Sequence, residues 1–197
     1  TFFEIGVALV LTQPYRLKRV VSYLDPWKDQ FDSGYQLTQS LIAFGRGEWA
    51  GVGLGNSIQK LFYLPEAHTD FIFAIIAEEF GLMGSLAILA LFVMLVVSGF
   101  TIARRAEIAN MPFAACFAYG LTLLIGLQAT INMAVNTGLL PTKGLTLPLI
   151  SYGGSSLLMT CLCIGVLARV EMERLARSKA EGKGDKPQWT RGGAVYE

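Results

Sequence analysis

Four apolar runs stand out along the chain. The first, at 2–11, is too short to cross a bilayer alone, whereas those at 80–100, 113–135 and 147–168 each hold more than twenty residues. A helix of about twenty apolar residues spans the ~30 Å hydrocarbon core. None of the long runs alternates with the period of two that a β-strand would give. The pattern therefore predicts an all-α, polytopic membrane protein.

Composition supports that class. Hydrophobic residues make up 53% of the 197 residues and charged residues only 16%, against about 25% in soluble domains. The formal net charge of +1, without a basic and aromatic stripe, gives no indication of a nucleic-acid partner.

Basic residues suggest an orientation. Arg104 and Arg105 lie between two apolar runs, and the tail after the last run is rich in lysine and arginine. The positive-inside rule places both in the cytoplasm, although the basic cluster at 15–19 then lies outside. The predicted organisation is the end of a transmembrane helix (1–12), a periplasmic loop with interfacial helices (13–70), transmembrane helices (71–103 and 113–135), a periplasmic loop (136–148), a transmembrane helix (149–168) and a cytoplasmic tail (169–197).

Polar side chains recur within the apolar runs. Gln128, Asn132 and Asn136 form an i, i+4, i+8 row, and amides face lipid only at high cost. Two interpretations stay open: interhelical hydrogen bonds, or the wall of a substrate cavity open to the outer face. Ser151 in "SYGGSS" and Glu78 are further candidates for the cavity lining.

The stretch "LPEAHTDFIFAIIAEEFG" (64–81) concentrates charge where an apolar run begins. Asp70 lies where the N-cap residue of a helix is expected. On a continuous helix, Glu78 and Glu79 would lie ~12–13 Å from it along the axis, too far for a paired-carboxylate hydrolase. A single outer-face carboxylate remains, and the spacing of His68 suggests no metal site.

Three motifs resemble the SEDS family (shape, elongation, division, sporulation). They are "GYQLTQSLIAFGRGEWAGVGLGNSIQKL", "LPEAHTDFIFAIIAEEFG" and "GLLPTKGLTLPLISYGGSS", and the resemblance covers roughly residues 13–170. The last motif, with Lys143, is closer to the cell-division member than to the elongation member, whose loop usually lacks that lysine. The resemblance implies a ten-helix fold, of which this chain would be the C-terminal part with the large periplasmic loop.

The resemblance also implies an activity. SEDS proteins are peptidoglycan glycosyltransferases that polymerise lipid II into glycan strands, and the family's essential acid corresponds to Asp70. Loss of a lipid pyrophosphate requires one base for the attacking hydroxyl and positive charge for the leaving group. That charge is expected from Lys143, Arg46 and Lys60, or from a divalent cation.

Partners and location follow from the same resemblance. They are lipid II, a class B penicillin-binding protein of the FtsI type, activators of the FtsQ, FtsB and FtsL type, and membrane lipid. The expected location is the bacterial inner membrane at the division septum, with a cytoplasmic C-terminus. A lipid II flippase or other transporter, and a non-catalytic division scaffold, stay open as alternatives.

Overall fold

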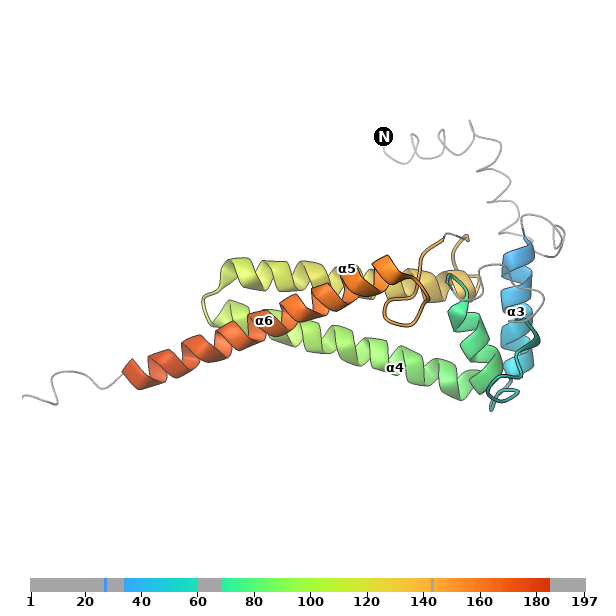
Figure 1. Cartoon of the computed structure of the whole chain (residues 1–197), viewed down its shortest axis with the longest axis horizontal. Coiled ribbons are helices and arrows are strands. Elements are labelled where there is room, and N and C mark those ends of the chain that lie inside the picture. The colour runs from blue at the N-terminus through green and yellow to red at the C-terminus, as the bar shows by residue number, and fades with distance from the viewer. Residues whose placement is uncertain (1–26, 28–33, 60–68, 143, 185–197) are drawn as a thin grey trace, which may run out of the picture.

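The computed structural model describes residue 27 and residues 34–59, 69–142 and 144–184, with side chains described up to Lys179. Its elements are the helices α3 (Tyr35–Gly47), α4 (Ile72–Ile108), α5 (Pro112–Asn136) and α6 (Gly154–Gly184). Figure 1 shows α4 and α5 side by side and antiparallel, with α6 crossing them and α3 at the end where α4 begins. No strand occurs in the described ranges, and the predicted all-α class is confirmed.

Three helices are long and apolar enough to cross a membrane: α4, α5 and the Gly154–Lys179 part of α6. Many of their large apolar side chains are exposed, among them Leu91, Val97, Leu127 and Leu158. Such a surface suits lipid rather than water. The chain is therefore a multi-pass membrane protein. The shortest apolar run, at 2–11, lies outside the described residues.

Helix α4 is broken at Gly81, which the apolar pattern did not predict. Gly81 has φ 66° and ψ −159°, a conformation essentially restricted to glycine. Such a break leaves backbone carbonyls before it and N–H groups after it without helical partners. The shorter first segment of α4 thus turns away from the axis of the longer second segment (Figure 1).

The glycine-rich segment that follows α3 supplies those missing partners. The N–H groups of Val52 and Gly53 donate to the carbonyls of Glu78 and Glu79, each at 3.0 Å. After the break, the N–H of Leu82 donates to the carbonyl of Glu48 at 2.9 Å. The segment therefore completes the hydrogen bonding of the kink.

This contact depends on the absence of side chains at two glycines. A Cβ on Gly47 would lie 1.9 Å from the carbonyl oxygen of Ala77, and one on Gly51 would lie 2.1 Å from that of Glu79. Gly51 also has φ +78°. These glycines allow the chain after α3 to pack directly on α4.

Two apolar clusters hold the helices together. One lies near the turn between α4 and α5, where α6 crosses, and consists of Ala103, Ala106, Met111, Ala115, Ala118, Leu167 and Val170. The other lies nearer the kink and consists of Phe73, Phe92, Ala129, Met133 and Leu147. The second cluster fixes the start of α4 against the end of α5, which is where the candidate site lies.

Candidate active site

Asp70 lies at the start of α4 and is held through its backbone. Its carbonyl oxygen accepts hydrogen bonds from Nδ2 of Asn132 at 2.9 Å and from Nδ2 of Asn136 at 3.0 Å. The N-cap residue of α4 is Phe71, one position after the expected Asp70. The Asp70 side chain is half-buried. Asp70 is therefore positioned by α5 through its backbone carbonyl.

The amide row on α5 links three parts of the chain. Asn136 accepts a bond from the backbone N–H of Ala74 at 3.3 Å and so acts as a cap for α4 from another helix. Asn132 donates to the carbonyl of Leu145, and Gln128 donates to that of Thr146 at 3.0 Å. The row thus holds both the start of α4 and the loop before α6.

The loop before α6 passes directly beside the Asp70 carboxylate. A Cβ on Gly144 would lie 3.0 Å from Oδ2 of Asp70, so only glycine leaves that approach unhindered. Ser151 is buried and its Oγ accepts a hydrogen bond from the N–H of Leu147 at 2.7 Å. The loop is therefore fixed directly after its closest approach to Asp70, at Leu145, Thr146 and Leu147.

Glu78 belongs to a separate buried cluster rather than to the surroundings of Asp70. It is fully buried, accepts a hydrogen bond from Ser57 at 2.5 Å and lies 3.4 Å from Nη1 of Arg46. Its Oε1 has no hydrogen-bond partner, so the Arg46 contact there is an ion pair without good hydrogen-bond geometry. A buried carboxylate needs such compensation. The cluster joins α3 and the following loop to the first segment of α4.

The predicted site residues therefore fall into three groups. Asp70, Gln128, Asn132, Asn136 and Ser151 lie on the start of α4, the end of α5 and the loop that joins α5 to α6. Arg46 and Glu78 pair with one another. Lys60 and Lys143 lie outside the described residues, as does His68, which was not predicted as a site residue. Ser57 was not predicted, because its partner Glu78 lies 21 positions away and no local pattern marks the contact.

The donor set for a metal is poor within the described ranges. They contain no group of three or more His, Cys, Asp or Glu side chains that could hold a metal ion. The described residues therefore offer no set of three such ligands, and the divalent cation stays a prediction.

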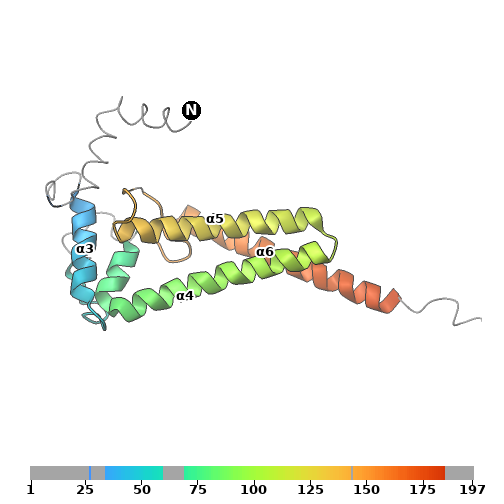
Figure 2. The same ribbon diagram turned by 180° about the vertical axis from the view of Figure 1, so that it is seen from behind.

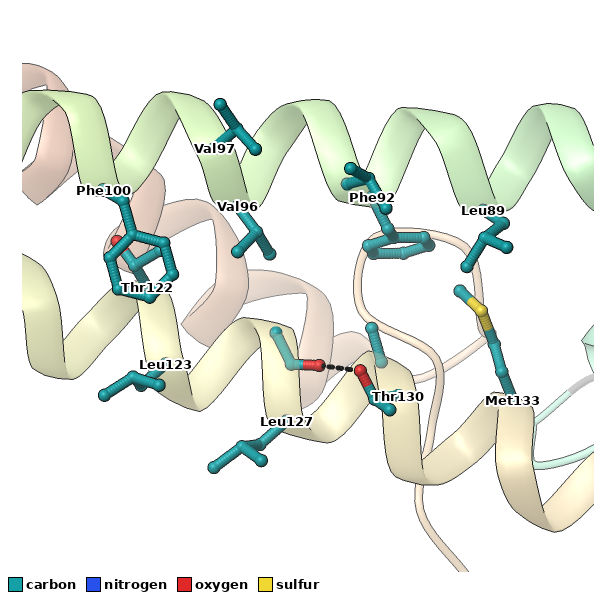
Figure 3. Close-up of a pocket in the computed structure, with 13 residues that line it drawn as sticks. Leu89, Phe92, Val96, Val97, Phe100, Thr122, Leu123, Leu127, Thr130 and Met133 are labelled. Carbon is teal, nitrogen blue, oxygen red and sulfur yellow. Dashed lines mark hydrogen bonds between the residues drawn. The ribbon is translucent and has the colours of Figure 1, made fainter. Parts of the chain in front are cut away.

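An apolar hollow of about 270 Å³ lies between α4 and α5, and Figure 3 shows Phe92 and Val96 of α4 facing it. Its two hydroxyl groups are satisfied within α5: Thr130 donates to the carbonyl of Gly126 at 2.8 Å, and Thr122 to that of Ala118 at 2.7 Å. No charged side chain lines it. The hollow offers nothing for polar chemistry, which leaves Asp70 as the candidate centre.

Asn136→Ala is expected to destabilise the fold by about 1–3 kcal/mol and to reduce activity, because it removes a cap of α4 and one of two donors to the Asp70 carbonyl. Thermal unfolding in detergent and turnover would measure both effects. Asn56→Ala is the matched control, since Asn56 is exposed and, among the described residues, its side chain bonds to the nearby Val52 carbonyl alone. Equal behaviour of the two variants would contradict a positioning role for Asn136.

The chain is similar to known proteins over nearly its whole length. A family model described as "Cell cycle protein" (FTSW_RODA_SPOVE) matches residues 1–176. The chain is 75% identical over 195 residues to the "Probable peptidoglycan glycosyltransferase FtsW" of Marinobacter nauticus, covering 98% of this chain and 48% of the relative. It is 64% identical over 186 residues to the protein of the same name from Hahella chejuensis, covering 94% and 47%.

A solved structure, described as "Structural coordination of polymerization and crosslinking by a peptidoglycan synthase complex", is also similar. The TM-score is 0.63 at 28% identity, and the match covers 88% of this chain and 48% of that one. The chain thus spans about half the length of the curated relatives it matches. The predicted resemblance to the cell-division member is confirmed.

Proposed function

Because the chain belongs to the FtsW/RodA/SpoVE cell cycle protein family, the SEDS family of its motifs, we propose that it is part of a peptidoglycan glycosyltransferase. The substrate is lipid II, and the product is a glycan strand. The observation that carries the proposal is the placement of Asp70. Its backbone is fixed by two α5 amides while its carboxylate lies against Gly144.

Asp70 acts in this proposal as the general base. The 4-hydroxyl of one lipid-linked disaccharide attacks C1 of another, a new C1–O bond forms, and the bond from C1 to the pyrophosphate oxygen breaks. The hydroxyl proton passes to the Asp70 carboxylate. A base in this role must be held within hydrogen-bond reach of the proton it accepts, and fixing the backbone of Asp70 supports that requirement.

A pyrophosphate leaving group needs positive charge rather than a proton. We assign that charge to Lys143, which precedes Gly144 in the sequence, and to Lys60. Arg46, whose guanidinium pairs with buried Glu78, is assigned a supporting structural role instead. The divalent cation considered from the sequence carries no step here, because no described group of three or more ligands supports one.

The wider assignments are proposals as well. The basic residues of the α4–α5 turn and of α6 support a cytoplasmic C-terminus, which would place Asp70 on the periplasmic side. The similar solved structure is described as that of a peptidoglycan synthase complex, which supports a cross-linking partner such as a class B penicillin-binding protein. Location at the septum, and activation by proteins of the FtsQ, FtsB and FtsL type, rest on the family resemblance.

One experiment separates the proposed activity from its alternatives. Full-length protein is reconstituted in vesicles with fluorescent lipid II, and both polymer formation and transbilayer movement are followed. Glycan polymer is the expected result. Movement of lipid II without polymer would support a flippase, and neither activity, in the presence of the cross-linking partner, would support a scaffold.

Lys143→Ala is expected to lower the polymerisation rate by roughly 10²-fold, in the range that loss of one stabilising group for a developing anion produces, with little effect on thermal stability. Initial rates at saturating lipid II would measure this. Lys179→Ala, an exposed lysine in the last part of α6, is the control and should leave the rate unchanged. If both variants turn over alike, Lys143 does not serve the leaving group.

A further inference from the structure

A further hollow, which is polar unlike the one between α4 and α5, lies at the end of the bundle far from Asp70. It has a volume of about 210 Å³ and forms where α4 ends and α6 continues past it. Figure 2 shows α6 extending beyond the α4–α5 turn at this end. The lining residues are Arg105, Ile108, Ala109, Arg174, Arg177 and Ser178. Three guanidinium groups from two helices thus face one small space.

Two of these arginines are held in place by one carboxylate. Glu171 accepts two hydrogen bonds from Arg174, at 2.8 and 2.7 Å, and one from Arg105 at 3.3 Å. A guanidinium has five N–H donors, so both side chains keep further donors in fixed positions. Such pre-organisation favours binding of an acceptor with several oxygens, such as a phosphate.

The local charge also favours an anion. Arg177 pairs with Glu173 at 3.2 Å, so the three lining arginines face two of the described glutamates, which leaves one net positive charge among these five side chains. A further described acid, Glu107, accepts a hydrogen bond from Tyr119 at 3.1 Å and does not line the hollow. Among the side chains described up to Lys179, no carboxylate lines the hollow.

The surroundings of the hollow are apolar. Ile108 is 74% exposed and Phe113, at the start of α5, is 83% exposed. On α6, Leu175, which follows the lining residue Arg174, is also exposed. Because the membrane-spanning candidates α4 and α5 end here, the arginines lie where an apolar surface meets a charged one. A ligand that matches both the charged and the apolar surface has a phosphate group and an apolar chain.

We propose that this hollow is a binding site for the phosphate of an anionic phospholipid headgroup. Arg105, Arg174 and Arg177 bind the phosphate oxygens, and the acyl chains run along the exposed apolar side chains beside Ile108. Basic pockets between membrane helices recognise such headgroups elsewhere. The site is separate from the proposed glycosyltransferase centre and does not depend on that function.

The test uses full-length protein in phosphatidylcholine nanodiscs that contain increasing phosphatidylglycerol, with bound lipid counted by native mass spectrometry. We expect one saturable phosphatidylglycerol. The double variant Arg105→Gln with Arg177→Gln should weaken it by roughly 25-fold, at about fivefold for each basic residue at an anionic surface. Both side chains are more than half exposed, so the fold should tolerate the change; Arg174→Gln provides a second variant.

The matched control is Arg104→Gln with Arg169→Gln, which removes the same charge from two exposed arginines that do not line the hollow. It should weaken binding by less than about threefold. Equal losses in the two double variants would show diffuse surface attraction and overturn the proposal. Displacement of the lipid by millimolar inorganic phosphate would also overturn it, since the site would then take a soluble anion.

Discussion

Gly81→Ala is expected to lower the melting temperature of the full-length protein by roughly 3–6 °C, because it costs about 3 kcal/mol and each kcal/mol lowers the melting temperature by about 1–2 °C in a protein twice this chain's length. The φ of 66° with ψ of −159° costs an alanine about 1–3 kcal/mol in backbone strain. The new Cβ would also lie 2.5 Å from the N of Gly51 and 2.7 Å from the carbonyl oxygen of Gly47. These contacts are with backbone, which cannot rotate away.

The destabilisation caused by Gly81→Ala should extend to the candidate site around Asp70. The kink, the loop after α3 and the first segment of α4 form one hydrogen-bonded unit. Gly120→Ala is the matched control: no atom lies within 4 Å of a Cβ built there, and the residue is inside α5. It should leave the melting temperature unchanged or slightly higher, because alanine favours a helix interior. Equal melting temperatures for the two variants would contradict the structural role of the kink.

Asp70→Asn is expected to abolish polymerisation while leaving the fold intact. The two amide contacts from α5 reach the backbone carbonyl of Asp70, which asparagine retains. The side chains are nearly the same size, so the approach of Gly144 is also preserved. The substitution removes the basic carboxylate, and a general base typically contributes about 10²–10⁴ in rate.

Asp70→Glu separates charge from position. It keeps the carboxylate but moves it by one methylene, and we expect a rate between those of wild type and Asp70→Asn. Thermal unfolding of both variants serves as the folding control. Full activity in Asp70→Glu together with loss of activity in Asp70→Asn would still be consistent with Asp70 as the general base. Full activity in both variants would show that Asp70 is not the base.

Much of this architecture could be predicted from the sequence because it is encoded locally. Three apolar runs of sufficient length predicted α4, α5 and α6, and the four-residue spacing of Gln128, Asn132 and Asn136 predicted a polar row facing away from lipid. The cost of exposing an amide to hydrocarbon is a property of the single residue. The partners of these amides are not a property of a single residue. The sequence therefore did not show that the row binds the carbonyls of Asp70, Leu145 and Thr146.

The features that were missed depend on contacts between distant segments. A single glycine in an apolar run looks like a tolerated helix residue, and only the approach of Gly47 and Gly51 shows why α4 breaks at Gly81. The sequence likewise did not identify Arg46 and Ser57 as the contacts of Glu78, whose predicted place in a cavity lining stays a prediction. A charged residue inside an apolar run signals that some partner exists but does not identify it.

The proposed function depends above all on the Asp70 carboxylate being the base for glycan polymerisation. It is tested by the initial rate of polymer formation from labelled lipid II, compared between wild-type and Asp70→Asn protein at equal concentrations of folded protein. We predict that the variant loses at least about 10² in rate at an unchanged melting temperature. A rate within about threefold of wild type would show that Asp70 is not the base.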